Sequence, residues 1–120
     1  MRWAWLVLGA LAASCAPPPP AAVAAEVSCA PEGSALRQRC RVRLTDRRNG
    51  RPVEGATVTL QADMPSMPLV HSVRPVVATP AGSGTYQGTL EFEMAGRWVV
   101  AVRIAGPVRD QVTHALDVNP

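Results

Sequence analysis

The chain has 120 residues, of which 48% are hydrophobic and 18% are charged, and its formal net charge at pH 7 is +3. This length is enough for one small hydrophobic core. The sequence contains no GxSxG nucleophile elbow, no HExxH zinc motif, no phosphate-binding glycine loop and no close pair of catalytic carboxylates. With two His residues in the whole chain, a catalytic triad is not expected, and we predict that the protein is not an enzyme.

Residues 1–15 have the pattern of an export signal. A positively charged start is followed by an uninterrupted apolar run from Trp3 to Ala13, which is too short to span a bilayer. Cys15 follows after small residues, and the segment resembles the lipobox of bacterial lipoproteins, where such a cysteine is acylated and becomes the mature N-terminus. We therefore expect a protein on the periplasmic side of the cell envelope, anchored to the membrane by a lipid on Cys15.

Residues 16–25 are rich in Pro and Ala and include four consecutive prolines. Such a run favours polyproline II, a semi-rigid spacer that rises about 3.1 Å per residue. We expect this tether to hold a domain of residues 26–120 away from the membrane. The alternative is an ordinary signal peptide cut within residues 22–25, which would leave an unusually long gap after the apolar run. Both interpretations predict export.

The three cysteines also indicate export. Setting Cys15 aside leaves Cys29 and Cys40, an even pair suited to an oxidising compartment. Their spacing is not that of a CxxC motif, and the intervening residues 31–33 indicate a turn between two strands. We predict a structural disulfide, which contributes about 3 kcal/mol in the chain-entropy model.

Alternating arginines dominate the strand predicted for residues 36–45. Period-two spacing places Arg37, Arg39, Arg41 and Arg43 on one face, and Cys40, Val42 and Leu44 on the other. We expect the arginines to form a solvated sheet face. Attraction to anionic lipid headgroups is the second interpretation, if the protein is anchored to a membrane. Nucleic-acid binding is not expected, because export removes that partner and no aromatic residues interleave the charges.

The rest of the chain alternates short strands with turns and has no helical periodicity. The predicted strands are residues 27–30, 36–45, 56–62, 73–78, 86–93, 98–104 and 112–118. The Asn-Gly pair within residues 46–52 is a hairpin signal. This pattern predicts an all-β antiparallel sandwich. We expect a hairpin from Tyr86 to Trp98, which holds all the aromatic residues after the leader, to be the centre of the core.

The segment from Met64 to His71 is a candidate metal site. It places two thioethers, Met64 and Met67, and the imidazole of His71 among prolines that keep the backbone extended. Thioether sulfur favours Cu(I), and imidazole also suits copper. The alternative is that the methionines pack under a loop and that His71 is a solvated residue. Met94 is either a third sulfur ligand or a cap on the core, and His114 is expected to be half-buried rather than a ligand.

Residues 43–104 resemble the YtkA-like domain family, which is related to the periplasmic part of FixH-type proteins. The similarity rests on the stretches GRPVEGATVTLQADMPSMPLVH (residues 50–71) and GTYQGTLEFEMAGRWVVAVRI (residues 84–104). The resemblance implies an immunoglobulin-like β-sandwich of about seven strands in the cell envelope. It also implies frequent association with copper handling or cytochrome oxidase maturation, and sometimes with metal-efflux assemblies.

Two functional hypotheses remain. In the first, the protein binds Cu(I) through Met64, Met67 and His71 and passes it to an envelope metal-handling or oxidase-assembly protein. In the second, it is a metal-free structural or adaptor lipoprotein that docks a membrane complex through its sandwich edge and arginine face.

Overall fold

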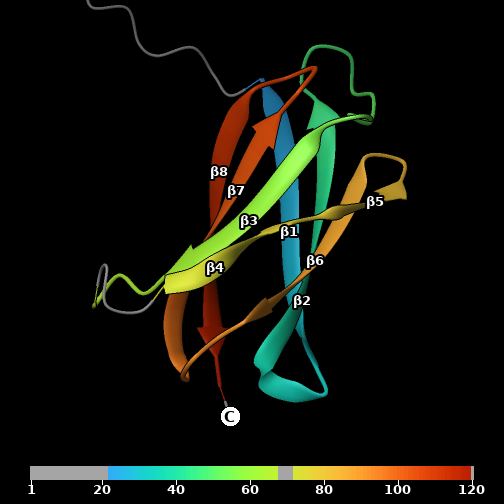
Figure 1. Cartoon of the computed structure of the whole chain (residues 1–120). Helices are drawn as coiled ribbons and strands as arrows, with labels where there is room; N and C mark the ends of the chain where they lie inside the picture. Colours follow the sequence, from blue (N-terminus) through green and yellow to red (C-terminus); the bar gives the residue numbers. More distant parts are fainter. Residues whose placement is uncertain (1–21, 68–71, 120) are drawn as a thin grey trace, which may run out of the picture.

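The computed structural model describes residues 22–67 and 72–119, and within them the protein is all-β. Eight strands form two four-stranded antiparallel sheets (Figure 1). The strands are β1 (Val23–Glu32), β2 (Ser34–Asp46), β3 (Thr57–Asp63), β4 (Ser72–Val77), β5 (Thr79–Gly82), β6 (Thr85–Glu91), β7 (Gly96–Ala105) and β8 (Asp110–Val118). The predicted fold class is therefore confirmed.

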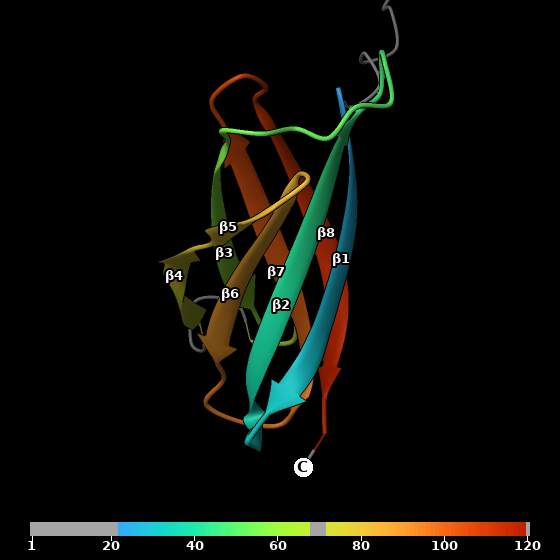
Figure 2. The same cartoon turned by 90° about the vertical axis from the view of Figure 1, so that its right-hand side faces the viewer.

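The two sheets have the strand orders of an immunoglobulin-like sandwich. Sheet A runs β1-β2-β6-β5, and sheet B runs β4-β3-β7-β8. This arrangement matches an immunoglobulin constant-type sandwich with β4 as an additional edge strand. Figure 2 shows β1, β2 and β6 of sheet A lying side by side.

The inward faces follow the alternation of the sequence, because successive side chains of a strand point to opposite sides of its sheet. Trp98 and Tyr86 are the largest fully buried side chains. The rings of Phe92 and Trp98 pack edge to face, with their centroids 5.0 Å apart. The side chains that the sequence predicts to face inward on β2, β3, β6 and β7 are buried. They are Cys40, Val42, Leu44, Ala56, Val58, Leu60, Ala62, Tyr86, Leu90, Trp98, Val100, Val102 and Ile104.

Two predicted hairpins are wrong. The chain does reverse at residues 46–52, where Gly50 N–H donates to the carbonyl of Asp46 at 2.8 Å. However, β2 pairs with β1 and β6, and β3 lies in the other sheet. Likewise β6 and β7, which carry Tyr86 and Trp98, belong to different sheets. Turn residues specify a local reversal, and the burial of each face decides which sheet the next strand joins.

The sandwich begins earlier than expected. Strand β1 starts at Val23, so the expected domain boundary at Glu26 falls inside the strand. Val23 is 1% exposed and pairs with Asp46, and the carbonyl of Ala22 accepts a hydrogen bond from Arg47 N–H at 3.1 Å. The Ala-rich composition of residues 22–25 concealed this strand, because it lacks an alternation of apolar and polar residues.

The crossover of residues 47–56 is fixed to the core by a tyrosine hydroxyl. Tyr86 Oη donates to the carbonyl of Val53 at 2.8 Å and accepts from Ala56 N–H at 3.1 Å. Both backbone groups are thereby satisfied in the interior, where an unpaired polar group would be costly. The segment that joins the two sheets is therefore held in a defined position.

Candidate functional site

The sandwich has two ends with different chemistry. We refer to the end at which β1 begins as the tether end; it comprises the crossover 47–56, the turn 83–84 and the loop 106–109. The opposite end comprises the turn 64–67 and the connection 92–95, and we refer to it as the methionine end (Figure 1). The antiparallel register places these segments at opposite ends of the strands.

A hydrogen-bonded turn joins the backbones of Met64 and Met67. Met67 N–H donates to the carbonyl of Met64 at 3.0 Å, which closes a four-residue turn through Pro65 and Ser66. The side chains differ in exposure, since Met64 is 3% exposed and Met67 is 38% exposed. One thioether residue is therefore packed in the core, and the other is accessible from solvent.

Met64 also contacts the first residue of β7, Gly96. A Cβ atom on Gly96 would lie 2.9 Å from Cε of Met64, so the methyl group packs directly on the glycine backbone. Met94, two residues before this glycine, is 37% exposed, and its carbonyl accepts a hydrogen bond from Trp98 Nε1 at 3.2 Å. The side chain of Met94 is therefore partly exposed at the methionine end.

Only one of the two histidines, His114, lies within the described residues. His71 lies outside the described residues. His114 pairs in register with Val100 in the middle of β8 and is half-buried, as expected. The described residues contain no group of three or more His, Cys, Asp or Glu side chains that could hold a metal ion. Met64 and Met67 are the two predicted metal ligands that the structure describes.

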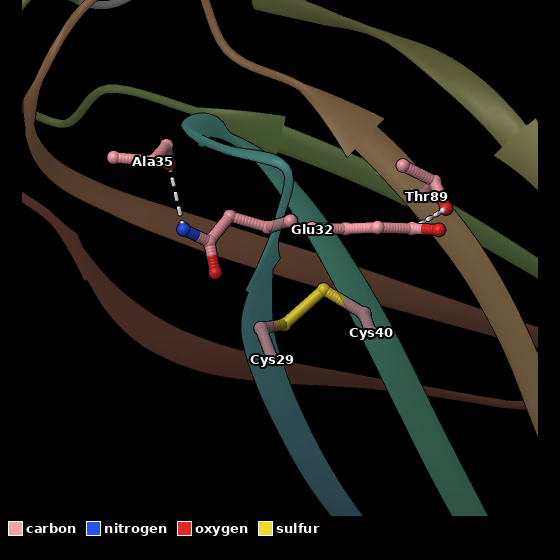
Figure 3. Close-up of a disulfide and its surroundings, with 6 residues drawn as sticks. Cys29, Glu32, Ala35, Cys40 and Thr89 are labelled. Carbon is pink, nitrogen blue, oxygen red and sulfur yellow. Dashed lines mark hydrogen bonds between the residues drawn. A yellow bond between two sulfur atoms is a disulfide. The ribbon is translucent and has the colours of Figure 1, made fainter.

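Cys29 and Cys40 form the predicted disulfide (Figure 3). They face each other in register on β1 and β2, with Cα atoms 4.0 Å apart. β1 is an edge strand whose inward residues Ala25, Val27 and Cys29 are only partly buried. The disulfide therefore secures a strand that packing alone holds weakly, and it leaves neither thiol free to bind a metal.

The arginine face of β2 is exposed, as predicted, but its members differ in their partners. Arg37 pairs with Glu91 at 3.8 Å, and Arg39 pairs with Glu32 at 3.0 Å. Glu32 also accepts a hydrogen bond from Thr89 Oγ1 at 3.1 Å (Figure 3). Within the described residues, Arg41 and Arg43 have no ion-pair partner. Alternation in the sequence located the face, but it could not show which arginines are paired.

The turn after β2 carries a local ion pair. Arg48 donates from its side chain to both carboxylate oxygens of Asp46, at 3.3 and 3.1 Å, and its backbone N–H donates at 2.8 Å. These hydrogen bonds hold the pKa of Asp46 below its ordinary value, and those from the Arg48 side chain have a larger effect than the one from its backbone. The same contact raises the pKa of Arg48. This pair stabilises the turn at the tether end.

The fold and the disulfide define a small immunoglobulin-like sandwich suited to an oxidising compartment. The family model described as YtkA-like matches residues 21–103, which is more than half of the chain, and the protein therefore belongs to the YtkA-like family. Membership of this family indicates an extracytoplasmic domain of the cell envelope. Neither the curated proteins nor the solved structures include a significant match. In the part of the chain that the structure describes, no helix has the length and apolarity that crossing a membrane requires.

Proposed function

We propose that the protein is a non-enzymatic lipoprotein whose methionine end binds Cu(I) as cargo in copper handling or oxidase maturation. The observation that carries this proposal is the hydrogen-bonded turn from Met64 to Met67, which fixes two thioether residues three positions apart. Thioether sulfur is a soft ligand that favours Cu(I). Met67 is accessible to an incoming ion, and His71 follows four residues later in the sequence.

The start of β1 supports anchoring through Cys15. A cut after Ala24 or Ala25 would remove Val23, a fully buried core residue that pairs with Asp46. Acylation and cleavage at Cys15 would leave β1 intact, together with the Pro-rich tether. Intact-mass measurement of protein extracted from membranes should give an acylated chain that begins at Cys15. A soluble species that begins between Ala22 and Glu26 would contradict the anchor.

The metal proposal is tested by titrating Cu(I) into the chain that begins at Ala16. This chain keeps the whole described core, since every buried core residue lies between Val23 and Val118. A start at Glu26 would delete the first three residues of β1. Competition with a chromophoric Cu(I) chelator gives the affinity, and we expect one ion per chain.

Substitution of the methionines separates ligation from packing. Leu preserves most of the volume of Met but removes its sulfur, so Met64→Leu combined with Met67→Leu should abolish Cu(I) binding while the chain stays folded. The matched control is Met94→Leu, because Met94 and Met67 are 37% and 38% exposed. This control should leave the affinity unchanged. If the double variant binds as tightly as the parent, the metal proposal is wrong.

The contribution of His71 predicts a pH dependence. Thioethers do not titrate, whereas a neutral imidazole is required for ligation. The affinity should therefore weaken as the pH falls below the ordinary imidazole pKa of about 6.5. His71→Ala should weaken binding at neutral pH and flatten this response. A parent whose affinity is constant from neutral to mildly acidic pH would exclude His71 from the site.

A metal-free adaptor lipoprotein is the second candidate function. It is favoured by the burial of Met64, whose methyl group packs on Gly96 as a core residue would. In this case the arginine face and the sandwich edge dock a membrane complex. An unaltered melting temperature with excess Cu(I), combined with no measurable binding, would favour this function over the first.

A further inference from the structure

A cleft on the outer face of sheet A combines cations with hydroxyl groups. It has a volume of about 530 Å³ and spans β1, β2 and the turn between β5 and β6. Its polar lining residues are Glu26, Ser28, Arg41, Arg43, Ser83 and Thr85. A guanidinium group offers a planar fork of donors that matches phosphate oxygens, and hydroxyl groups donate to the same oxygens. The cleft therefore has the chemistry of a phosphate site.

The register of the strands concentrates these groups. On β1, Ser28 lies opposite Arg41 and Glu26 lies opposite Arg43, and on β6 Thr85 lies opposite Arg43. Directly opposed residues of antiparallel strands have Cβ atoms about 5 Å apart, so each arginine lies beside a hydroxyl group. Arg41 and Arg43 have no ion-pair partner within the described residues, in contrast to Arg37 and Arg39 on the same face.

The edge of the cleft at Ser83 is fixed in an unusual backbone conformation. Ser83 has a φ of 54°, a region in which residues with a side chain are uncommon, and it lies between two glycines. Gly84 N–H donates to Glu54 at 2.8 Å, and its carbonyl accepts from Leu44 N–H at 2.8 Å. The turn is thus held on both sides. Tight β-hairpin turns require such positive φ values, so the turn between β5 and β6 places Ser83 at the edge of the cleft.

The cleft lies close to the tether end. Glu26 is three residues along β1 from Val23, about 10 Å at the rise of a strand. We propose that the cleft binds the phosphate group of an anionic phospholipid and so seats the tether end on the membrane. This inference rests on the proposed envelope location but not on Cu(I) binding.

The experiment measures flotation of the chain that begins at Ala16 with vesicles. The vesicles contain phosphatidylglycerol mixed with phosphatidylcholine, or phosphatidylcholine alone. Arg41→Gln combined with Arg43→Gln should weaken binding to the anionic vesicles by about thirtyfold, which corresponds to about 1 kcal/mol for each arginine near an anionic surface. Binding of the parent should also fall steeply with added salt.

The matched control is Arg37→Gln combined with Arg39→Gln. It removes the same charge from the same strand face, but these arginines are paired with Glu91 and Glu32. We expect it to weaken vesicle binding by less than about threefold, as for arginines whose charge is already balanced. Equal losses in the two double variants would show that only net charge matters, and would overturn the proposed site.

A gain of binding gives an independent test. Glu26 is the one carboxylate among the lining residues, so Glu26→Gln should strengthen binding to anionic vesicles by about fivefold. Unchanged or weaker binding of this variant would contradict the proposal. Backbone amide signals of Ser28, Ser83 and Thr85 should shift with short-chain phosphatidylglycerol. If inorganic phosphate shifts them while the lipid does not, the cleft serves a soluble anion and the lipid proposal is wrong.

Because this test uses no metal, it can fail while the Cu(I) proposal stands. Equally, loss of Cu(I) binding in the methionine variants leaves the vesicle result unaffected. The chain used for flotation lacks Cys15, so its binding to vesicles reports on the cleft alone. The lipid anchor is tested separately, by the mass of the protein extracted from membranes.

Discussion

The two ends of the sandwich share one core but are stabilised in different ways. At the tether end, polar contacts fix the backbone: the Tyr86 hydroxyl bridges Val53 and Ala56, and Glu54 accepts from Gly84 N–H. At the methionine end, side-chain packing dominates, with Phe92 against Trp98. The backbone at the tether end is held in one position because hydrogen bonds are directional. The methionine end depends instead on the burial of apolar side chains.

Among the exposed arginines of the strands, charge pairing also differs between the two ends, although the turn after β2 at the tether end holds the Arg48–Asp46 ion pair. Toward the methionine end, Arg37, Arg39 and Arg97 each pair with a carboxylate, whereas Arg41 and Arg43 near the tether end do not within the described residues. Exposed ion pairs contribute little stability, so this pairing matters chiefly for which charges remain free to bind a ligand. The two proposals accordingly place soft-metal chemistry at one end and anion chemistry at the other.

The largest expected effect comes from the packing at the methionine end. Trp98→Ala should destabilise the protein by about 3–5 kcal/mol, as expected when a fully buried aromatic side chain is removed. Urea unfolding followed by circular dichroism measures this change. Met94→Ala, in the adjacent exposed position, should cost less than about 1 kcal/mol. A Trp98→Ala variant as stable as the parent would show that this end does not depend on apolar burial.

The next effect concerns β1, the strand that begins at the tether end. Replacing Cys29 and Cys40 together by Ala should destabilise the protein by about 3 kcal/mol, because the disulfide no longer restricts the unfolded chain. Thermal unfolding with and without reductant should show the same loss in the parent. An unchanged melting temperature under reduction would mean that β1 is held by packing and pairing alone.

The third effect concerns Gly84, whose replacement by Ala tests how tightly the backbone is packed at the tether end. A Cβ on Gly84 would lie 2.7 Å from the carbonyl oxygen of Leu44, and its φ is +72°. Gly84→Ala should therefore cost about 2–3 kcal/mol through strain and backbone displacement. Gly33, with a φ of +76° and nothing within 4 Å of its Cβ position, is the control. Gly33→Ala should cost about 1 kcal/mol, from the backbone conformation alone. Equal costs would contradict a tightly packed turn at Gly84.

The smallest effect is the ion pair of the tether end. The folded-state pKa of Asp46 is lowered by Arg48, so the pair stabilises the fold above the unfolded pKa of Asp, about 3.9. This stabilisation is lost as the pH falls through the lower folded-state pKa. Arg48→Gln should return the pKa of Asp46 toward its ordinary value, as measured from the pH dependence of its carboxyl carbon signal. An unchanged pKa would exclude Arg48 as the cause.

Regular alternation allowed the sequence to predict the inward faces of β2, β3, β6 and β7, whereas the Cys29–Cys40 disulfide was predicted from the even pair of cysteines that remains when Cys15 is set aside. The sequence could not predict which sheet β3 joins, because the turn at Asn49 and Gly50 reverses the chain in either case. Nor could it separate buried Met64 from exposed Met67, because the prolines interrupt the periodicity there. The lining role of Ser83 depends on a backbone conformation that only the folded turn defines.

The most direct test of the central claim, that the methionine end binds Cu(I), is a titration of the chain from Ala16 with methionine methyl carbons labelled. Its native methionines are Met64, Met67 and Met94, which give three distinguishable methyl signals. We predict that one equivalent of Cu(I) shifts the signals of Met64 and Met67 together and leaves that of Met94 unchanged. Signals that remain in place, or a shift of Met67 without Met64, would contradict a shared site in the turn.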